Sequence, residues 1–168
     1  DDGSQNGNEP DVVTNSATIN LTGQSEPGSQ VYLTHDNNSV GNIRTDNDGI
    51  YKMENVSLNE GNNSFRLVAM DPAGNQSPPS KEYLVEFISK APELNIESLE
   101  DGQTVSSKKL TIKGSTNPQN RLYLNDRFVM LGSNGSFETT LNLTVGENKL
   151  IFVAQDRAGG TTQKELTA

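Results

Sequence analysis

Residues 65–69 (FRLVA) and residues 150–154 (LIFVA) indicate the fold of this chain. In the first stretch Phe65, Leu67 and Ala69 fall on one face, and the second stretch repeats the spacing. A period of two residues is typical of a β-strand with one buried face. Each stretch then runs into a turn of the Asp-x-Ala-Gly type, DPAG or DRAG. A half-buried strand followed by the same turn therefore occurs twice.

The two stretches belong to a longer internal repeat. Residues 19–33 align with residues 110–124, and residues 58–74 align with residues 143–159. Self-similarity over this length indicates one structural unit present in two copies. Between the aligned segments the first copy has extra polar residues, from His35 to Asp48. We expect that stretch to form a loop of variable length outside the core.

Each copy is predicted to fold as an antiparallel β-sandwich. The positions expected to point inward are Ile19, Leu21, Val31, Leu33, Tyr51, Val56 and Leu58 in the first copy and Leu110, Ile112, Leu122, Leu124, Phe137, Leu141 and Leu143 in the second. Gly, Pro, Asn and Asp cluster between these strands, as turns require. Helical spacing with caps is absent from the sequence. Short strands at such intervals predict an all-β chain of two tandem sandwiches.

The domain limits follow from the same pattern. Residues 11–89 form the first predicted domain and residues 92–168 the second, after a flexible acidic tail at residues 1–10. The segment Ser89–Glu93, which contains a Pro, separates the last strand of the first domain from Leu94-Asn95-Ile96 of the second. Because so short a connection limits bending, we expect the domains to lie end to end as a short rod.

Composition excludes several classes of protein. The chain has 168 residues, 13 Lys and Arg against 22 Asp and Glu, one His, no Cys and no Trp. A net charge of -9 argues against nucleic acid and anionic lipid as partners. The lack of Cys excludes disulfides and thiolate zinc sites. No apolar run approaches the ~20 residues that span a bilayer, so we expect no membrane insertion and an already processed or excised segment.

Several motifs carry a family resemblance. In the first copy they are QSEPGSQV (24–31), DGIY (48–51), LNEGNN (58–63) and AMDPAGNQS (69–77), and the second copy keeps NGSF (134–137), GEN (146–148) and AQDRAG (154–159). The second copy departs from the pattern at Pro118-Gln119 and at Gly160, which replaces an Asn. Over residues 12–168 the chain resembles the tandem bacterial immunoglobulin-like repeats of surface and secreted proteins, including the glucodextranase B-domain group.

The resemblance implies two tandem immunoglobulin-like Greek-key β-sandwiches and an extracellular or cell-surface location. Members of this kind are mostly spacers, stalks and adhesive modules, and a few bind sugar or calcium. The expected function is therefore a non-enzymatic spacer or adhesion segment of a larger bacterial protein, whose other domains are its partners. A glycan- or calcium-binding accessory module is an alternative, as is a subunit of a filament built by β-strand addition.

One turn offers candidate metal ligands. Asp46 and Asp48, followed by Gly49, resemble half of a calcium loop with oxygen ligands at alternate positions. Arg44 and Ser57 stand where a complete loop would have further oxygen ligands. The alternative is an ordinary Asx-rich hairpin turn. Calcium is the one cofactor that the sequence suggests, and no other cofactor is expected.

No catalytic residues are predicted. His35 lies beside Asp36 in the predicted polar loop, and a solvated loop histidine is expected there. The carboxylates of Glu97, Glu100 and Asp101 are expected to form a solvated charge cluster rather than a glycosidic acid-base pair.

The two copies also share an aromatic position. Tyr32 and Tyr123 occupy the same strand position, opposite in pleat to the inward side chains. Either they point outward, as sugar-stacking residues would, or they pack across strands. Packing across strands is the favoured interpretation.

The first copy lacks a counterpart of the strand Leu94-Asn95-Ile96. The matching places hold Gly3 and Gln5, and only Val12 and Val13 could supply a short strand. Part of the neighbouring strand would then remain unpaired. One explanation is an excised fragment or a disordered tail, and the other is self-association by strand addition through the open edge of the first domain.

Overall fold

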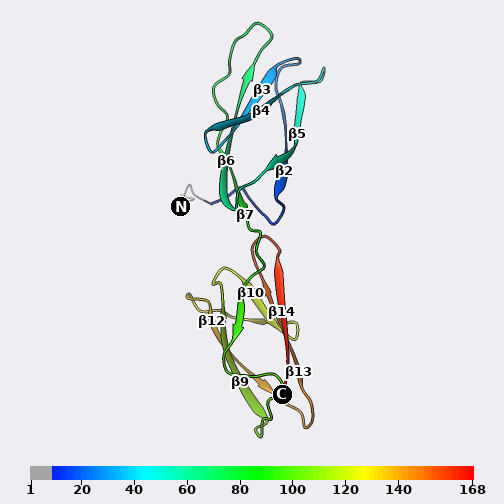
Figure 1. Ribbon diagram of the computed structural model, residues 1–168, viewed down its shortest axis with the longest axis vertical. Coiled ribbons are helices and arrows are strands. Elements are labelled where there is room, and N and C mark those ends of the chain that lie inside the picture. Colours follow the sequence, from blue (N-terminus) through cyan, green and yellow to red (C-terminus); the bar gives the residue numbers. More distant parts are fainter. Residues whose placement is uncertain (1–8) are drawn as a thin grey trace, which may run out of the picture. The chain divides into compact units, whose positions relative to one another are not determined.

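The computed structural model describes residues 9–168 (Figure 1). Gly3, Gln5 and most of the predicted tail lie outside the described residues. Residues 9–168 form β-strands and turns without a helix, so that part of the chain has no helix able to cross a membrane. The chain divides into two compact units, the first ending at Ser89 and the second beginning at Lys90. The all-β fold predicted from the alternation is confirmed.

Unit 1 is a sandwich of two sheets. Its strands are β1 (Val12–Thr14), β2 (Thr18–Gln24), β3 (Gln30–His35), β4 (Asn38–Arg44), β5 (Ile50–Ser57), β6 (Gly61–Met70) and β7 (Tyr83–Phe87). One sheet has five strands in the order β1-β7-β6-β3-β4, and the other has two, β2-β5. The alternating side chains of the two sheets meet in one core. Its buried members are Val31, Leu33, Met53, Leu58, Phe65 and Val85.

Unit 2 is also a sandwich of two sheets. Its strands are β8 (Leu94–Ile96), β9 (Lys109–Thr116), β10 (Arg121–Leu124), β11 (Arg127–Val129), β12 (Ser136–Asn142), β13 (Lys149–Gln155) and β14 (Thr161–Thr167). The sheets have the orders β11-β10-β13-β14 and β12-β9-β8. The buried core is larger than that of unit 1 and comprises Leu94, Leu99, Leu110, Ile112, Leu122, Leu124, Val129, Phe137, Leu150, Phe152 and Ala154.

The prediction of a variable loop from His35 to Asp48 is wrong. The chain turns tightly at Asp36 and Asn37, which have φ values of 49° and 65°, and returns as β4 beside β3. Two consecutive residues in the left-handed region match the twist of a two-residue hairpin, and Asp and Asn tolerate that conformation. The extra residues of the first copy therefore lengthen a hairpin at the edge of the sheet.

The short strand predicted at Val12 and Val13 is present as β1, but it does not cover β2. It pairs in parallel with β7, with Val12 opposite Val85 and Thr14 opposite Phe87. In unit 2, by contrast, β8 pairs antiparallel with β9, the counterpart of β2. Within residues 9–168 the outer edge of β2 has no strand beside it.

Candidate functional site

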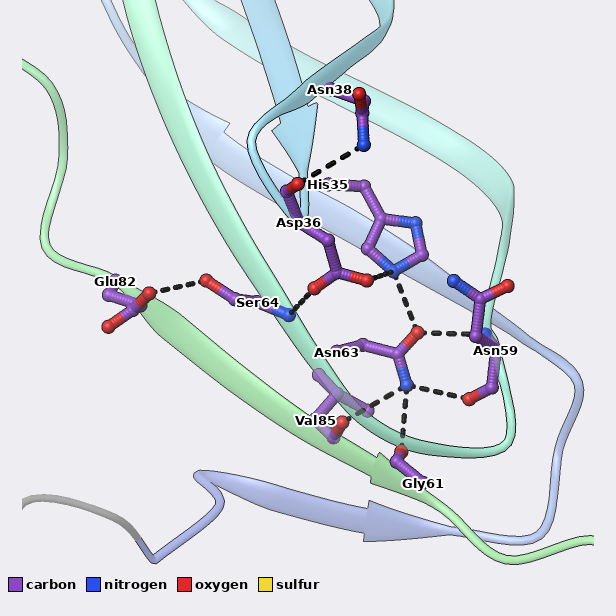
Figure 2. A network of polar contacts seen from close by, with 9 residues as sticks. All are labelled: His35, Asp36, Asn38, Asn59, Gly61, Asn63, Ser64, Glu82 and Val85. Atoms are coloured by element: carbon purple, nitrogen blue, oxygen red, sulfur yellow. Dashed lines mark hydrogen bonds and ion pairs between the residues drawn. The ribbon is translucent and has the colours of Figure 1, made fainter.

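The most connected group of polar side chains surrounds His35 in unit 1. The ring is only 9% exposed and stacks on Phe65, with the ring centroids 4.5 Å apart. Its Nε2 lies 2.7 Å from Asn63 Oδ1 and 3.3 Å from Asp36 Oδ2, as Figure 2 shows. The expectation of a solvated loop histidine is therefore wrong. His35 is buried because β3 extends two residues beyond Leu33, which places another side chain on the inward face.

The partners of Asn63 fix the hydrogen on His35. Asn63 Nδ2 donates to the carbonyl oxygens of Asn59, Gly61 and Val85, so the remaining atom of the amide, Oδ1, must be an acceptor. That oxygen also accepts the Asn59 N–H at 2.8 Å. His35 Nε2 consequently carries a hydrogen and donates it. A ring nitrogen engaged in this way is not available as a general base.

In unit 2 an asparagine side chain makes the same set of hydrogen bonds, but no histidine takes part. Asn148 Nδ2 donates to the carbonyl oxygens of Thr144, Gly146 and Ala168, and its Oδ1 accepts from the Thr144 N–H and hydroxyl. The Thr144 hydroxyl thus takes the place that His35 Nε2 has in unit 1. Because both copies use the Asn to tie a turn to the final strand, the group around His35 has a structural explanation.

Asp36 also has a structural partner. Its Oδ1 accepts the N–H of Ser64 at 2.9 Å, and its own N–H donates to the Ser64 carbonyl. In unit 2 the side chain and N–H of Asn125 make the same pair of bonds with Ile151. The Ser64 hydroxyl in turn donates to Glu82 on the other side of β6 (Figure 2). Asp36 therefore closes the β3–β4 hairpin onto β6.

The turn with the candidate calcium ligands is an Asx turn. Asp46 Oδ1 accepts the N–H groups of Asp48 and Ile50 at 2.9 and 2.8 Å. Gly49 has φ +77°, and a β-carbon there would lie 2.3 Å from the Ser25 carbonyl oxygen. Across residues 9–168, His, Asp and Glu side chains nowhere gather in a group of three or more suited to a metal ion. Calcium binding by Asp46 and Asp48 stays an untested prediction.

The repeated Asp-x-Ala-Gly turn is held by its first residue. Asp71 Oδ1 accepts the N–H of Asn75, and Oδ2 accepts the side-chain amide of Asn75 at 2.7 Å. These bonds hold the pKa of Asp71 below its usual value. Asp156 Oδ1 accepts two N–H groups, but with Gly160 in place of the Asn its Oδ2 is buried without a hydrogen-bond partner.

Of the three carboxylates singled out in unit 2, Asp101 has a structural partner. Asp101 Oδ1 accepts the N–H and the hydroxyl of Thr167 at 2.8 and 2.9 Å. The bond from the Thr167 N–H, followed by that from its hydroxyl, lowers the pKa of Asp101. This carboxylate anchors the segment after β8 to the end of β14.

The shared tyrosines follow the favoured interpretation in unit 2. Tyr123 packs edge-to-face against Phe128 of β11, with centroids 5.9 Å apart, and the two residues are direct cross-strand partners. Phe128 is 62% exposed, and Met130 beside it is 80% exposed. Sequence reasoning missed Phe128, although its position on a short edge strand next to the Asn125-Asp126 turn was a usable signal. In unit 1, Asn42 stands opposite Tyr32, and the aromatic pair is lost.

Comparison with known proteins agrees with this architecture. Residues 1–86 match the model of a family described as bacterial Ig-like domain. The chain belongs to this family. Residues 92–168 match a second model, described as glucodextranase, domain B, so both resemblances inferred from the motifs are confirmed. Ig-like domains of this kind are typical of bacterial surface or extracellular proteins and carbohydrate-related modules, and they are generally non-catalytic.

The individual proteins that match this chain share 25% of its sequence or less. Bacillopeptidase F of Bacillus subtilis (strain 168) is 25% identical over 154 residues, which cover 90% of this chain and 10% of that protein. The chain thus spans a small part of this relative. Among solved structures, the fibronectin(III)-like modules of Clostridium thermocellum CbhA have a TM-score of 0.49 at 15% identity, covering 96% of this chain and 90% of theirs. A tetra-tandem repeat from the extending region of a large adhesion protein has a TM-score of 0.39 at 23% identity, covering 90% and 45%.

Proposed function

We propose that this chain is a non-enzymatic spacer within a larger secreted or surface-attached bacterial protein. The observation that carries the proposal is that an asparagine side chain makes the same set of hydrogen bonds in both Ig-like units. The side chains of Asn63 and Asn148 use their hydrogen bonds to attach a turn to the end of the unit, at Val85 and Ala168. Polar groups committed to holding strands and turns suit a part whose task is mechanical.

A stiff connection between the units is the testable part of this role. Only the segment Ser89–Glu93, with Pro92, separates β7 and its extension from β8. We propose that so short a segment keeps the units extended relative to each other. The family's presence in surface and extracellular proteins supports this role.

Spin-label distances test the connection directly. The chain has no Cys, so single labels can be placed at Lys52→Cys in unit 1 and Glu138→Cys in unit 2, whose side chains are 58% and 60% exposed. We expect one narrow distance distribution by pulsed electron resonance. A matched variant with ten Gly and Ser residues inserted after Ala91 should give a broad one. Equally broad distributions in both chains would contradict the spacer role.

A second candidate function, contact with glycans, is favoured by the aromatic side chains on the outer face of unit 2. Tyr123, flanked by the buried Leu122 and Leu124, points outward between its partners Phe128 and Val153. Exposed aromatic side chains on the face of a sheet suit the stacking of sugar rings.

Thermal unfolding with millimolar oligosaccharides tests this candidate, because a ligand that binds only the native state raises Tm. We expect a rise that is lost in Phe128→Ser. The control Val40→Ser removes an apolar side chain, 50% exposed, from the edge strand of unit 1 and should keep the rise. The same Tm with and without sugar would reject glycan contact and leave the spacer role unaffected.

A further inference from the structure

The open edge of unit 1 has a backbone ready for pairing. The N–H of Ser25 donates to the carbonyl of Gly49, so the backbone N–H of Ser25 points toward β5. Neighbouring residues of an antiparallel strand alternate the side to which their N–H and C=O point. Gln24 and Thr22 therefore direct these groups away from β5, and within residues 9–168 no strand lies there.

Unit 2 shows what occupies the equivalent edge. There β8 runs antiparallel to β9, with Leu94 opposite Thr116 and Ile96 opposite Gly114. Leu94 is 3% exposed and belongs to the same buried cluster as Phe152. The strand thus supplies both hydrogen bonds and a core side chain.

Unit 1 has a pocket where such a side chain would enter. A hollow of about 270 Å³ is lined by Ser25, which follows β2, and by residues of the segment Ser77–Ser80. Its apolar lining is Val31, Tyr51, Leu67, Ala69 and Pro78.

The exposure of the residues that line the pocket shows that the pocket of unit 1 is only partly filled. Leu67 and Ala69 are half-buried, whereas Phe152 and Ala154 at the matching positions of unit 2 are both 0% exposed. The apolar surface left open in unit 1 would gain from burial by an incoming aliphatic side chain.

We propose that the edge of β2 and this pocket form a docking site for an extended strand of a second polypeptide chain. The strand adds antiparallel along Thr22–Gln24, with an aliphatic side chain opposite Ser25 in the pocket and another opposite Gly23. Residues 1–10 of this chain, DDGSQNGNEP, contain no aliphatic residue and do not match that requirement. The site adds an interaction to the spacer role and does not depend on it.

The probe is a synthetic peptide with the sequence of residues 90–98, KAPELNIES, which contains β8. Amide exchange of the full chain is followed by NMR with and without about 1 mM peptide. We expect exchange at Thr22 and Gln24 to slow at least ~10-fold. Exchange at Ser115, already covered by β8, should not change. A peptide carrying Leu94→Asp should have no effect.

Two chain variants locate the effect. Ala69→Leu fills the pocket from within, and Gln24→Pro removes an outward N–H from an edge strand. Both should abolish the peptide effect, and NMR signals of the unit 1 core residues Phe65 and Val85 report that unit 1 of each variant is folded. Unchanged exchange with peptide, or equal slowing by the Leu94→Asp peptide, would overturn the proposal. Slow exchange at Thr22 and Gln24 without peptide, independent of protein concentration, would overturn it too, since the chain itself would then cover the edge. Slow exchange that appears only as the protein concentration rises would support it, because a second copy would then be the second chain.

Discussion

At the scale of single residues, each unit depends on one asparagine. Asn63 and Asn148 follow a glycine with positive φ and convert an irregular turn into a fixed attachment for the last strand. Their amides donate to backbone carbonyls of the turn and at the final strand. In unit 1 the bond to the Val85 carbonyl is buried, and a buried bond is costly to lose. The sequence indicated turn chemistry here, but it did not show the bond to Val85, which lies 22 residues away in the chain.

Replacing this asparagine should destabilise unit 1 strongly. Asn63→Ala removes one buried and three partly buried bonds to backbone groups and leaves the donor of His35 without its closest acceptor, so we expect a loss of about 3 kcal/mol. Asn62→Ala, at the exposed neighbour, is the matched control and should change stability by less than about 0.5 kcal/mol. Urea unfolding followed through the methyl signals of Leu33 measures both. Similar midpoints for the two variants would contradict the role of Asn63.

The unpartnered oxygen of Asp156 predicts a stabilising substitution. Gly160→Asn supplies the amide that Asn75 provides in unit 1, and Gly160 does not have a positive φ, so an Asn fits its backbone. A β-carbon would lie 2.6 Å from Oδ2, so the carboxylate must move slightly. We expect a gain of about 1 kcal/mol in unit 2. Asn75→Gly should lower the stability of unit 1 by less, because its bonds to Asp71 are exposed. Thermal unfolding checks both, and a lower Tm for Gly160→Asn would show that the close contact outweighs the bond.

At the scale of elements, alternation identified the strands of the core because one face of each is buried. It failed at β4, where residues 38–42 are exposed on both faces and carry no period. The turn Asp36-Asn37 lacks the Gly that usually marks a two-residue hairpin, so the polar run read as a loop. The burial of His35 followed from that hairpin and could not be predicted without it.

The bonds of Asp101, which attach the segment after β8 to β14, predict that the stability of unit 2 depends on pH. The folded-state pKa of Asp101 is lowered by its bonds to Thr167, so its contribution to stability is present above the unfolded value of about 4 and is lost as pH falls below it. Asp101→Asn should lower the stability of unit 2 at pH 7 and flatten its decline in acid. Urea midpoints from pH 7 to pH 2.5, followed through Leu150, measure this. Parallel curves for both chains would exclude Asp101 as a source of the acid sensitivity.

At the scale of the whole molecule, the protein consists of two Ig-like units that are joined through a short segment. Each unit has its own core, and the division falls between Ser89 and Lys90. The sequence repeat predicted this duplication because matching turns and strands recur in register. A spacer requires in addition that the two units keep extended positions in solution.

Small-angle X-ray scattering of the full chain tests that requirement most directly. A compact globule of 168 residues would have a radius of gyration of about 15 Å. For a spacer we expect a two-lobed distance distribution and a radius of gyration of about 20 Å or more, unchanged across a concentration series. A single-lobed distribution with a radius near that of the compact globule would contradict it.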